Sequence, residues 1–288
     1  MSTACCNEWH GSPECVAGPS RASWPVVSDL TILYRDAALV AVNKPPGLLV
    51  HRSAIDRHEA RFALQLLRDV LGQRVWPVHR LDKGTSGALL FALSRDAASA
   101  LGGAFEAGAV EKRYVALVRG WPSAEGVIEY PLTRRTDDAD PHGAAPDAHV
   151  VQPATTRFCR LGIVELEAPV ERYPTSRYAL VALAPRTGRA HQIRRHLKHI
   201  AHPVIGDATY GKGRHNRFVA ERVGTRRLWL HAVSLAFTHP VTGERLVIEA
   251  PLSEEWTGIV GLGEWRWDTS WRVGGALPAQ QAWALRCD

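Results

Sequence analysis

Short apolar runs separated by turn-forming residues recur along this 288-residue chain and constrain its fold more than any other feature. Strand-like runs lie within residues 30–51, 88–93, 112–120, 177–185, 227–240 and 245–251. Helices are predicted at residues 59–72, 94–108 and about 189–200. Because the strands follow one another through short turns, without regular strand–helix alternation, the sequence predicts an α+β fold. We expect a mixed, largely antiparallel central sheet flanked by helices and loops.

The two ends of the chain differ from the segment between them. Residues 1–28 are rich in Ser, Gly, Pro and Cys, which predicts a disordered extension without a secretory signal. Residues 29–255 hold the periodic segments and form the expected folded domain, in which 132–150 is a polar, mobile insertion. Residues 256–288 form a Trp-rich tail that either packs on this domain or offers stacking surfaces.

The overall charge and the cysteine content narrow the class of protein. A net charge of +6 suits a polyanionic partner, but it also suits an ordinary solvated surface. No apolar window approaches the roughly 18 residues of a membrane span, so a membrane protein is not expected. Five cysteines, an odd number, fit a reduced cytoplasmic protein.

The densest charge lies in RTGRAHQIRRHLKHIAHP, residues 186–203, which contains no Asp or Glu. On a helix, Ile193, Leu197 and Ile200 form an inward apolar stripe. The cationic ridge that faces elsewhere consists of His191, Arg194, Arg195 and Lys198. The run is either a solvated helix face or a site for an anion, namely a phosphate backbone or a carboxylate from elsewhere in the chain.

Two groups of candidate metal ligands do not favour a metal site. His196, His199 and His202 are surrounded by Arg and Lys, and no acidic or thiol ligand accompanies them before Asp207. The second group lies in the N-terminal extension and consists of Cys5, Cys6, His10 and Cys15, whose spacing is not that of a zinc finger. We therefore predict no metal.

The run VHRLDKGTSGALLFAL, residues 78–93, presents a single acid, Asp82, in a Gly/Ser/Thr loop. Such an acid is an Asx turn or a helix cap, or, if it is buried beside the cationic helix, a nucleophile paired with an arginine. One Arg at bidentate geometry would stabilise the ionised form. The chain lacks the signatures of P-loop, dinucleotide-binding, serine-elbow and zinc-hydrolase enzymes.

Six segments together resemble the RluA-type pseudouridine synthases. In chain order they are NKPPGLLVH (43–51), HRLDKGTSG (79–87), KRYVALVRG (112–120), RTGRAHQIRRHL (186–197), HPVIGDATYG (202–211) and LHAVSLAFTHP (230–240). The resemblance covers roughly residues 30–252 and would make 29–255 the catalytic domain. The runs VHRSAIDRHE (50–59) and ERYPTSRYAL (171–180) are most similar to the branch of the family that acts on uridine 65 of tRNA.

The resemblance implies a role for each matched residue. Asp82 would attack a flipped-out uridine and break its N1–C1′ bond, through either an acylal or a glycal-like species, before the uracil rejoins through C5. Arg194 would pair with Asp82, and Tyr114 would lie against the base and assist loss of the C5 proton. Arg80 would fill the gap left by the flipped nucleotide, and Ile193 would form an apolar wall of the base pocket.

The remaining expectations concern partners. Further RNA-binding residues are predicted at His79, Arg186, Arg189, His191, Arg195 and Lys198. No cofactor is expected, because the reaction is an isomerisation, and the protein is expected to be a monomer. Two alternatives stay open: a synthase that acts on ribosomal RNA, and a non-catalytic RNA-binding or chaperone protein on the same fold.

Overall fold

The computed structural model describes residues 30–51, 60–134 and 150–268. One large sheet carries the strands in the order β1 (Thr31–Arg35), β2 (Leu39–Lys44), β4 (Ser86–Ala92), β11 (Leu230–Thr238), β5 (Glu111–Arg119), β10 (Ser176–Pro185), β9 (Thr155–Leu166) and β13 (Arg266–Trp267). Pairing at its flanks adds β3 (Trp76–Pro77), β6 (Glu125–Glu129) and β12 (Arg245–Glu249), whereas β7 (Leu132–Thr133) and β8 (Val151–Gln152) form a separate pair.

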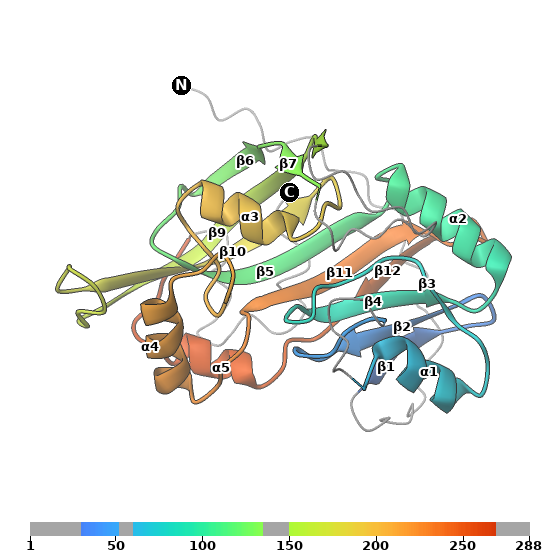
Figure 1. The fold of residues 1–288 in the computed structure, drawn as a ribbon, viewed down its shortest axis with the longest axis horizontal. Helices are drawn as coiled ribbons and strands as arrows, with labels where there is room; N and C mark the ends of the chain where they lie inside the picture. Colours follow the sequence, from blue (N-terminus) through green and yellow to red (C-terminus); the bar gives the residue numbers. More distant parts are fainter. Residues whose placement is uncertain (1–29, 52–59, 135–149, 269–288) are drawn as a thin grey trace.

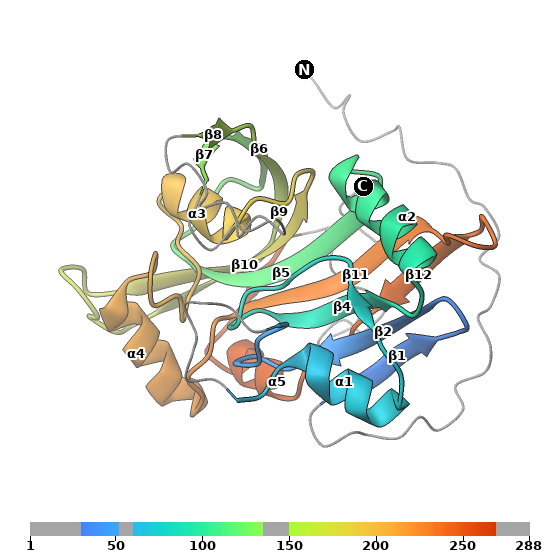
Figure 2. The same cartoon turned by 45° about the vertical axis from the view of Figure 1, so that its right-hand side comes forward.

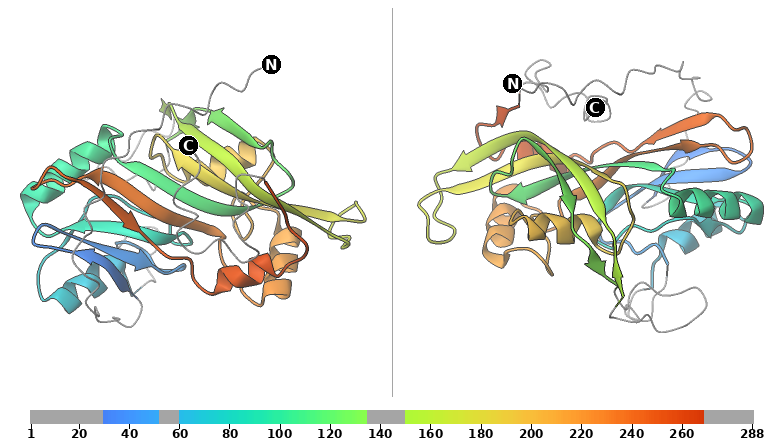
Figure 3. Two further views of the ribbon diagram at one scale, coloured as in Figure 1. Left: turned by 180° about the vertical axis from the view of Figure 1, so that it is seen from behind. Right: turned by 90° about the horizontal axis from the view of Figure 1, so that it is seen from above.

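Within the described segments, every strand pair of the large sheet is antiparallel except β4 with β11. The helices are α1 (Ala63–Leu71), α2 (Arg95–Glu106), α3 (Gln192–His199), α4 (Gly213–Val223) and α5 (Glu255–Val260). Figures 1 and 2 show α1, α2 and α3 on one side of the sheet, and Figure 3 shows the strands in front of them when seen from behind. The α+β prediction with a mixed, largely antiparallel sheet is confirmed.

Local sequence signals explain where several elements begin and end. The Ser94 side chain accepts a hydrogen bond from the amide of Ala97 at 3.1 Å, so it caps α2. Gly72 ends α1 with φ 63°, the left-handed conformation that glycine adopts without a steric penalty. Asp36 accepts the amides of Ala38 and Leu39 and thereby forms the turn between β1 and β2.

Two helix predictions need correction. The helical spacing of Phe62, Leu66 and Val70 predicts that these residues form the apolar stripe of α1, but Val70 is 38% exposed and the helix buries Ala63 and Leu67 instead. The register differs because Phe62 is the extended N-cap and lies outside the helix. The basic helix begins at Gln192 and not near 189, because His191 has φ 52° and so cannot continue a right-handed helix.

The first part of the Trp-rich tail packs on the sheet. Trp256 in α5 is only 2% exposed and meets Trp229 edge-on at 5.2 Å between ring centroids, whereas Trp265 and Trp267 stack on each other. The packed body therefore continues to Asp268, past the boundary predicted at 255. The predicted N-terminal extension with its cysteine cluster, most of the 132–150 insertion and the rest of the tail lie outside the described residues.

Strand β11 joins the two halves of the sheet and brings the candidate site together. It pairs with β4, which follows Asp82, and with β5, where Tyr114 lies opposite Ala232. The parallel approach requires a glycine at position 87, because Gly87 has φ 113° and a Cβ there would lie 2.1 Å from the carbonyl oxygen of Ala232. No helix among the described residues is long and apolar enough to cross a membrane.

Candidate active site

Asp82 and Arg194 meet across 112 residues of sequence. Nη1 of Arg194 donates to Oδ2 of Asp82 at 2.9 Å. Ile193 and Leu197 of α3 are buried against β5 and β10, as the predicted stripe requires. Arg194 itself is only 8% exposed, so of the alternatives for the cationic run it fits a site for a carboxylate from elsewhere in the chain and not a solvated helix face. Its pairing with Asp82 is present.

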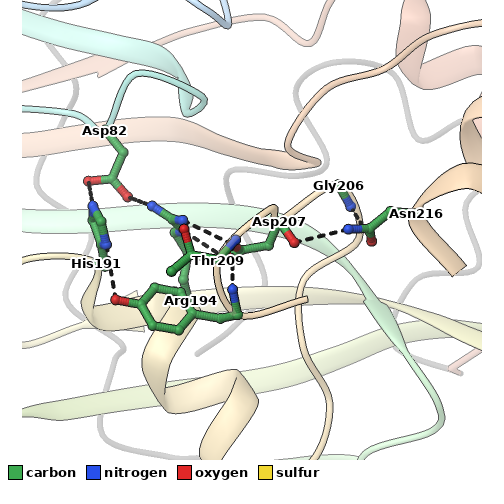
Figure 4. A network of polar contacts seen from close by, with 8 residues as sticks. Asp82, His191, Arg194, Gly206, Asp207, Thr209 and Asn216 are labelled. Atoms are coloured by element: carbon green, nitrogen blue, oxygen red, sulfur yellow. Dashed lines mark hydrogen bonds and ion pairs between the residues drawn. The ribbon is translucent and has the colours of Figure 1, made fainter. Parts of the chain in front are cut away.

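A second carboxylate, Asp207, fixes the orientation of this arginine. Its two oxygens accept hydrogen bonds from Nε and Nη2 of Arg194 at 2.7 and 2.9 Å. Oδ1 of Asp207 also accepts the amides of Thr209 and Tyr210, each at 2.9 Å (Figure 4). The bidentate acceptor of Arg194 is therefore Asp207, whereas Asp82 receives a single hydrogen bond.

Arg194 and the carboxylates of Asp207 and Asp82 stabilise one another's charged forms. Burial alone lowers the pKa of the Arg194 guanidinium, but the hydrogen bonds and charges of Asp207 and Asp82 raise it above its ordinary value. Burial alone raises the pKa of the Asp207 carboxyl, but Arg194 and the amides of Tyr210 and Thr209 lower it below its ordinary value. Both partners therefore stay charged at neutral pH.

Lys44 ties the segment NKPPG to the Asp82 loop. It is 0% exposed, and its Nζ donates to the carbonyl oxygens of Pro45, Leu48 and Lys83 at 2.9, 2.7 and 3.2 Å. Burial lowers the pKa of Lys44 to about 7, although the charge of Asp82 opposes this shift. Because Lys83 directly follows Asp82, this lysine holds the backbone of the loop that presents the carboxylate.

A second buried network holds the other end of the loop. Oγ of Ser86 lies 2.8 Å from Nδ1 of His231 and accepts a hydrogen bond from Arg227. Arg227 also pairs with Glu255 of α5, and its guanidinium lies over the rings of Trp229 and Trp256. The start of the Trp-rich tail therefore supports the strand that follows Asp82.

His191 lies beside Asp82 in a left-handed backbone conformation. Its Nε2 is 3.9 Å from Oδ1 of Asp82, and its Nδ1 is 3.2 Å from the hydroxyl of Tyr210. The next residue, Gln192, anchors the loop before α3 because its amide group bonds Thr187, the Arg189 amide, the Thr155 carbonyl and Thr156. His191 thus faces the carboxylate and not the solvent.

A cavity of about 460 Å³ opens on the α2 side of Asp82. Its apolar and aromatic wall includes Tyr114, Ile193 and Leu230, and Arg80, Arg186 and Arg189 also line it. Burial, with a smaller contribution from the charge of Asp82, raises the pKa of Tyr114 above its ordinary value. The phenol is therefore neutral at pH 7. The sheet thus places Tyr114 and Asp82 on the same cavity.

Several of the residues predicted to bind RNA also have partners within the protein. His79 has its ring stacked on Phe105, and its Nε2 accepts the amide of Leu90, so the structure gives it a framework role. Burial lowers its pKa to about 3. Arg189 donates to the carbonyl of Pro153, and Arg195 donates to that of Thr133. Arg186 and Lys198 are exposed, and Lys198 lies over the ring of Tyr210.

The sequence interpretation missed Lys44, Asp207 and Gln192, although each lies in a segment used for the resemblance. A signal for Asp207 was present, since it is the first acid after the acid-free run 186–203. Lys44 and Gln192 gave no signal, because a sequence does not show that a long polar side chain folds back into the core.

The described residues contain no group of three metal-ligating side chains. His196 lies against Thr156 and the Tyr130 carbonyl, and His202 lies against the Arg119 carbonyl. His196 and His202 therefore bind different parts of the protein and do not form a common site.

The arrangement suits nucleophilic chemistry at a carbon atom. Asp82 is 20% exposed in its side chain, and a guanidinium held by Asp207 fixes one of its oxygens. A carboxylate held in this way can attack an electrophilic carbon in an adjoining cavity. A second cavity, of about 680 Å³, opens from the same carboxylate toward α4.

Comparison with known proteins agrees with this geometry. The model of the RNA pseudouridylate synthase family matches residues 38–199. The tRNA pseudouridine synthase C of Pasteurella multocida is 48% identical over 237 residues, which are 82% of this chain and 97% of that protein. The protein of the same name from Salmonella typhi is 49% identical over 82% of this chain and 91% of its own length.

Solved structures show the same likeness. Human RNA Pseudouridylate Synthase Domain Containing 1 has a TM-score of 0.59 and 27% identity over 80% of this chain and 86% of its own. The human domain-containing protein 4 has a TM-score of 0.59 and 26% identity over 80% of this chain and 91% of its own. The resemblance to the RluA-type enzymes is confirmed, and the chain belongs to the RNA pseudouridylate synthase family and is an RNA pseudouridine synthase.

Proposed function

We propose that this enzyme converts one uridine of tRNA, uridine 65, to pseudouridine, with Asp82 as the nucleophile. The substrate class is supported by relatives of 48% and 49% identity that are named tRNA pseudouridine synthase C. The observation that carries the catalytic assignment is the carboxylate of Asp82, held by Arg194 where two cavities meet.

The proposed reaction begins when the target uridine leaves its stack and enters the cavity beside Tyr114, at a cost of a few kcal/mol for unstacking. A carboxylate oxygen of Asp82 forms a bond to C1′ as the N1–C1′ bond breaks, and the electron pair of the broken bond stays on the uracil. The uracil turns within the cavity, and its C5 forms a bond to C1′ as the bond between Asp82 and C1′ breaks and returns its electron pair to the carboxylate. C5 then loses its proton while N1 gains one, so the atoms balance and no cofactor enters.

The neighbouring side chains have complementary proposed roles. Arg194 stabilises the carboxylate whenever Asp82 is free of the substrate. Tyr114 offers a ring face to the uracil and a neutral hydroxyl near C5, because its raised pKa excludes tyrosinate at neutral pH. Ile193 closes the apolar wall. Arg80 is exposed at the junction of the two cavities, where its planar guanidinium can stack in place of the flipped base.

The test is conversion of tRNA by the recombinant enzyme, with pseudouridines mapped by carbodiimide modification and primer extension. We expect one modified position, uridine 65, and no product at that position when the transcript carries cytidine there. Asp82→Asn should abolish the product while the melting temperature stays within a few degrees of the unsubstituted enzyme. A folded Asp82→Ala enzyme that still forms pseudouridine would remove Asp82 from the mechanism.

The same mapping applied to total RNA distinguishes the alternatives. Product in ribosomal RNA but not in tRNA would replace the proposed substrate. An RNA affinity that survives Asp82→Asn, in a protein that modifies no RNA at all, would instead favour a binding or chaperone role.

A further inference from the structure

The cavity of about 680 Å³ lies between the Asp82 loop and α4. It shares five lining residues with the Tyr114 cavity: Arg80, Leu81, Asp82, His191 and Arg194. The two cavities therefore open from the same carboxylate, one toward α2 and β5 and the other toward α4. A nucleotide whose base enters the first would leave its backbone and its neighbours near the second.

The α4-side cavity carries excess positive charge. Its cationic lining residues are Arg80, Lys83, Arg194, Arg217, Arg226 and Arg227, whereas its acids are Asp82 and Asp207. Both acids are bonded to Arg194, so they do not neutralise the outer wall. Arg217 and Arg226 form that wall and are exposed, and neither takes part in an ion pair within the described segments.

The position of this wall is fixed relative to Asp82. Asn216 precedes Arg217 in α4. Its side chain accepts a hydrogen bond from the Gly206 amide and donates one to the Asp207 carbonyl, each at 2.9 Å. Asp207 in turn binds Arg194, which binds Asp82, so one chain of hydrogen bonds joins α4 to the carboxylate (Figure 4). From the other side, α4 is held by His215, whose ring bonds the Tyr178 hydroxyl at 2.9 Å.

We propose that this arginine wall, Arg217 and Arg226, binds the phosphodiester backbone of the RNA strand next to the flipped uridine. The inference rests on the proposed function. It adds a subsite, because neither Arg217 nor Arg226 is among the RNA-binding residues predicted from the sequence. In protein–DNA complexes, contacts to phosphate and sugar supply about half to two-thirds of the hydrogen bonds and fix the register of the protein on the nucleic acid. Arg suits this role because its planar fork matches two phosphate oxygens.

The test compares Arg217→Gln, Arg226→Gln and the double variant with Arg222→Gln. Arg222 is on the same helix, about 140° around it from Arg217. Its guanidinium lies over Phe218 at 5.3 Å, and it does not line the α4-side cavity. All three single substitutions change the net charge equally. The dissociation constant of each variant for tRNA is measured at several salt concentrations, in an Asp82→Asn background that prevents turnover.

We expect each of Arg217→Gln and Arg226→Gln to weaken binding about 10- to 15-fold, the lower end of the range for hydrogen bonds to charged groups. The slope of log Kd against log salt should fall by about 0.7 to 0.9 for each lost phosphate contact. Arg222→Gln should stay within about twofold. Arg217→Lys should recover most of the salt slope, because lysine keeps the charge.

Several outcomes would overturn the subsite. If Arg217→Gln and Arg226→Gln bind tRNA like Arg222→Gln while the unsubstituted enzyme binds and modifies tRNA, the wall does not contact phosphate but the proposed function stands. A salt slope that stays lowered in Arg217→Lys, in variants with unchanged melting temperatures, would also exclude a phosphate contact, because lysine keeps the charge. An unsubstituted enzyme that neither binds nor modifies tRNA overturns the proposed function and the subsite together.

Discussion

The carboxylate of Asp207 binds Nε and Nη2 of Arg194 at 2.7 and 2.9 Å, and this geometry leaves Nη1 to reach a second anion. That anion is Asp82, at 2.9 Å. Asp207 is fully buried, and backbone amides fix its own orientation. The direction in which Arg194 points is therefore set by a residue that does not line the Tyr114 cavity.

Asp207→Asn should cost both stability and catalysis. An asparagine cannot accept hydrogen bonds from both nitrogens of Arg194. The buried guanidinium then lacks its carboxylate partner, which should lower the unfolding free energy by about 3–5 kcal/mol. A catalytic group displaced by about 1 Å loses on the order of 100-fold in rate, so kcat/KM should fall by this amount. Urea unfolding and turnover of tRNA measure the two effects.

Asp82→Asn is the matched control for Asp207→Asn. Both substitutions remove one negative charge from the same arginine, but Asp82 is 20% exposed and accepts one bond from Arg194. We expect its cost in unfolding free energy to be about 1 kcal/mol. Equal destabilisation by the two substitutions would contradict the assignment of the supporting role to Asp207.

Lys44→Met should weaken the Asp82 loop. The substitution leaves the carbonyls of Pro45, Leu48 and Lys83 without their ammonium donor. We expect a loss of at least about 2 kcal/mol in unfolding free energy, together with a lower kcat. Lys212→Met, at an exposed position, should change stability by no more than about 0.5 kcal/mol. Equal stability of the two variants would show that the buried bonds contribute nothing net.

Gly87→Ala should prevent native pairing of β4 with β11. A Cβ would lie 2.1 Å from the Ala232 carbonyl oxygen at a φ of 113°, which implies a cost of at least about 3 kcal/mol. Gly102→Ala in α2 is the control, since nothing lies within 4 Å of its Cβ. That substitution should stabilise the helix by up to about 1 kcal/mol. Thermal unfolding of the two variants should therefore shift in opposite directions.

Acid should destabilise the protein through its buried histidines. Burial lowers the pKa of His231 to about 4 and that of His79 to about 3, from an ordinary value of 6.5. Below pH 6.5 the unfolded chain binds protons that the folded chain does not, so the unfolding free energy falls as the pH drops toward 4. For His231 alone the loss approaches about 3 kcal/mol.

Urea unfolding between pH 7 and pH 4 measures this loss. His231→Gln should be less stable at pH 7, because it alters the contacts with Ser86 and the Ala250 carbonyl. Its stability should depend less on pH, because one proton-uptake site of the unfolded chain is gone. A His231→Gln profile parallel to that of the unsubstituted protein would show that His231 is not held neutral.

The sequence predicted the fold class, most strands and the limits of α2, because alternation and capping residues act locally. It placed α3 three residues too early, since His191 carries no composition signal of its left-handed backbone. Asp82, Tyr114 and Arg194 came from motif resemblance, and the structure brings them to adjoining walls.

The supporting residues could not be predicted in the same way. Asp207 and Lys44 act through contacts that depend on the packing of distant segments, and the stacking of His79 on Phe105 also joins residues that are far apart in the sequence. Residues with long-range partners are therefore the ones a sequence pattern describes least well.

The parallel pairing of β4 with β11 has a consequence for synthesis on the ribosome. Ser86 emerges 145 residues before its partner His231, and Asp82 emerges 112 residues before Arg194. Until β11 arrives, the nascent β1–β2–β4 segment exposes an open edge, which favours slow folding and chaperone engagement. A chain released before residue 230 lacks the strand that pairs with both β4 and β5, so we expect pseudouridine formation only after translation has passed β11.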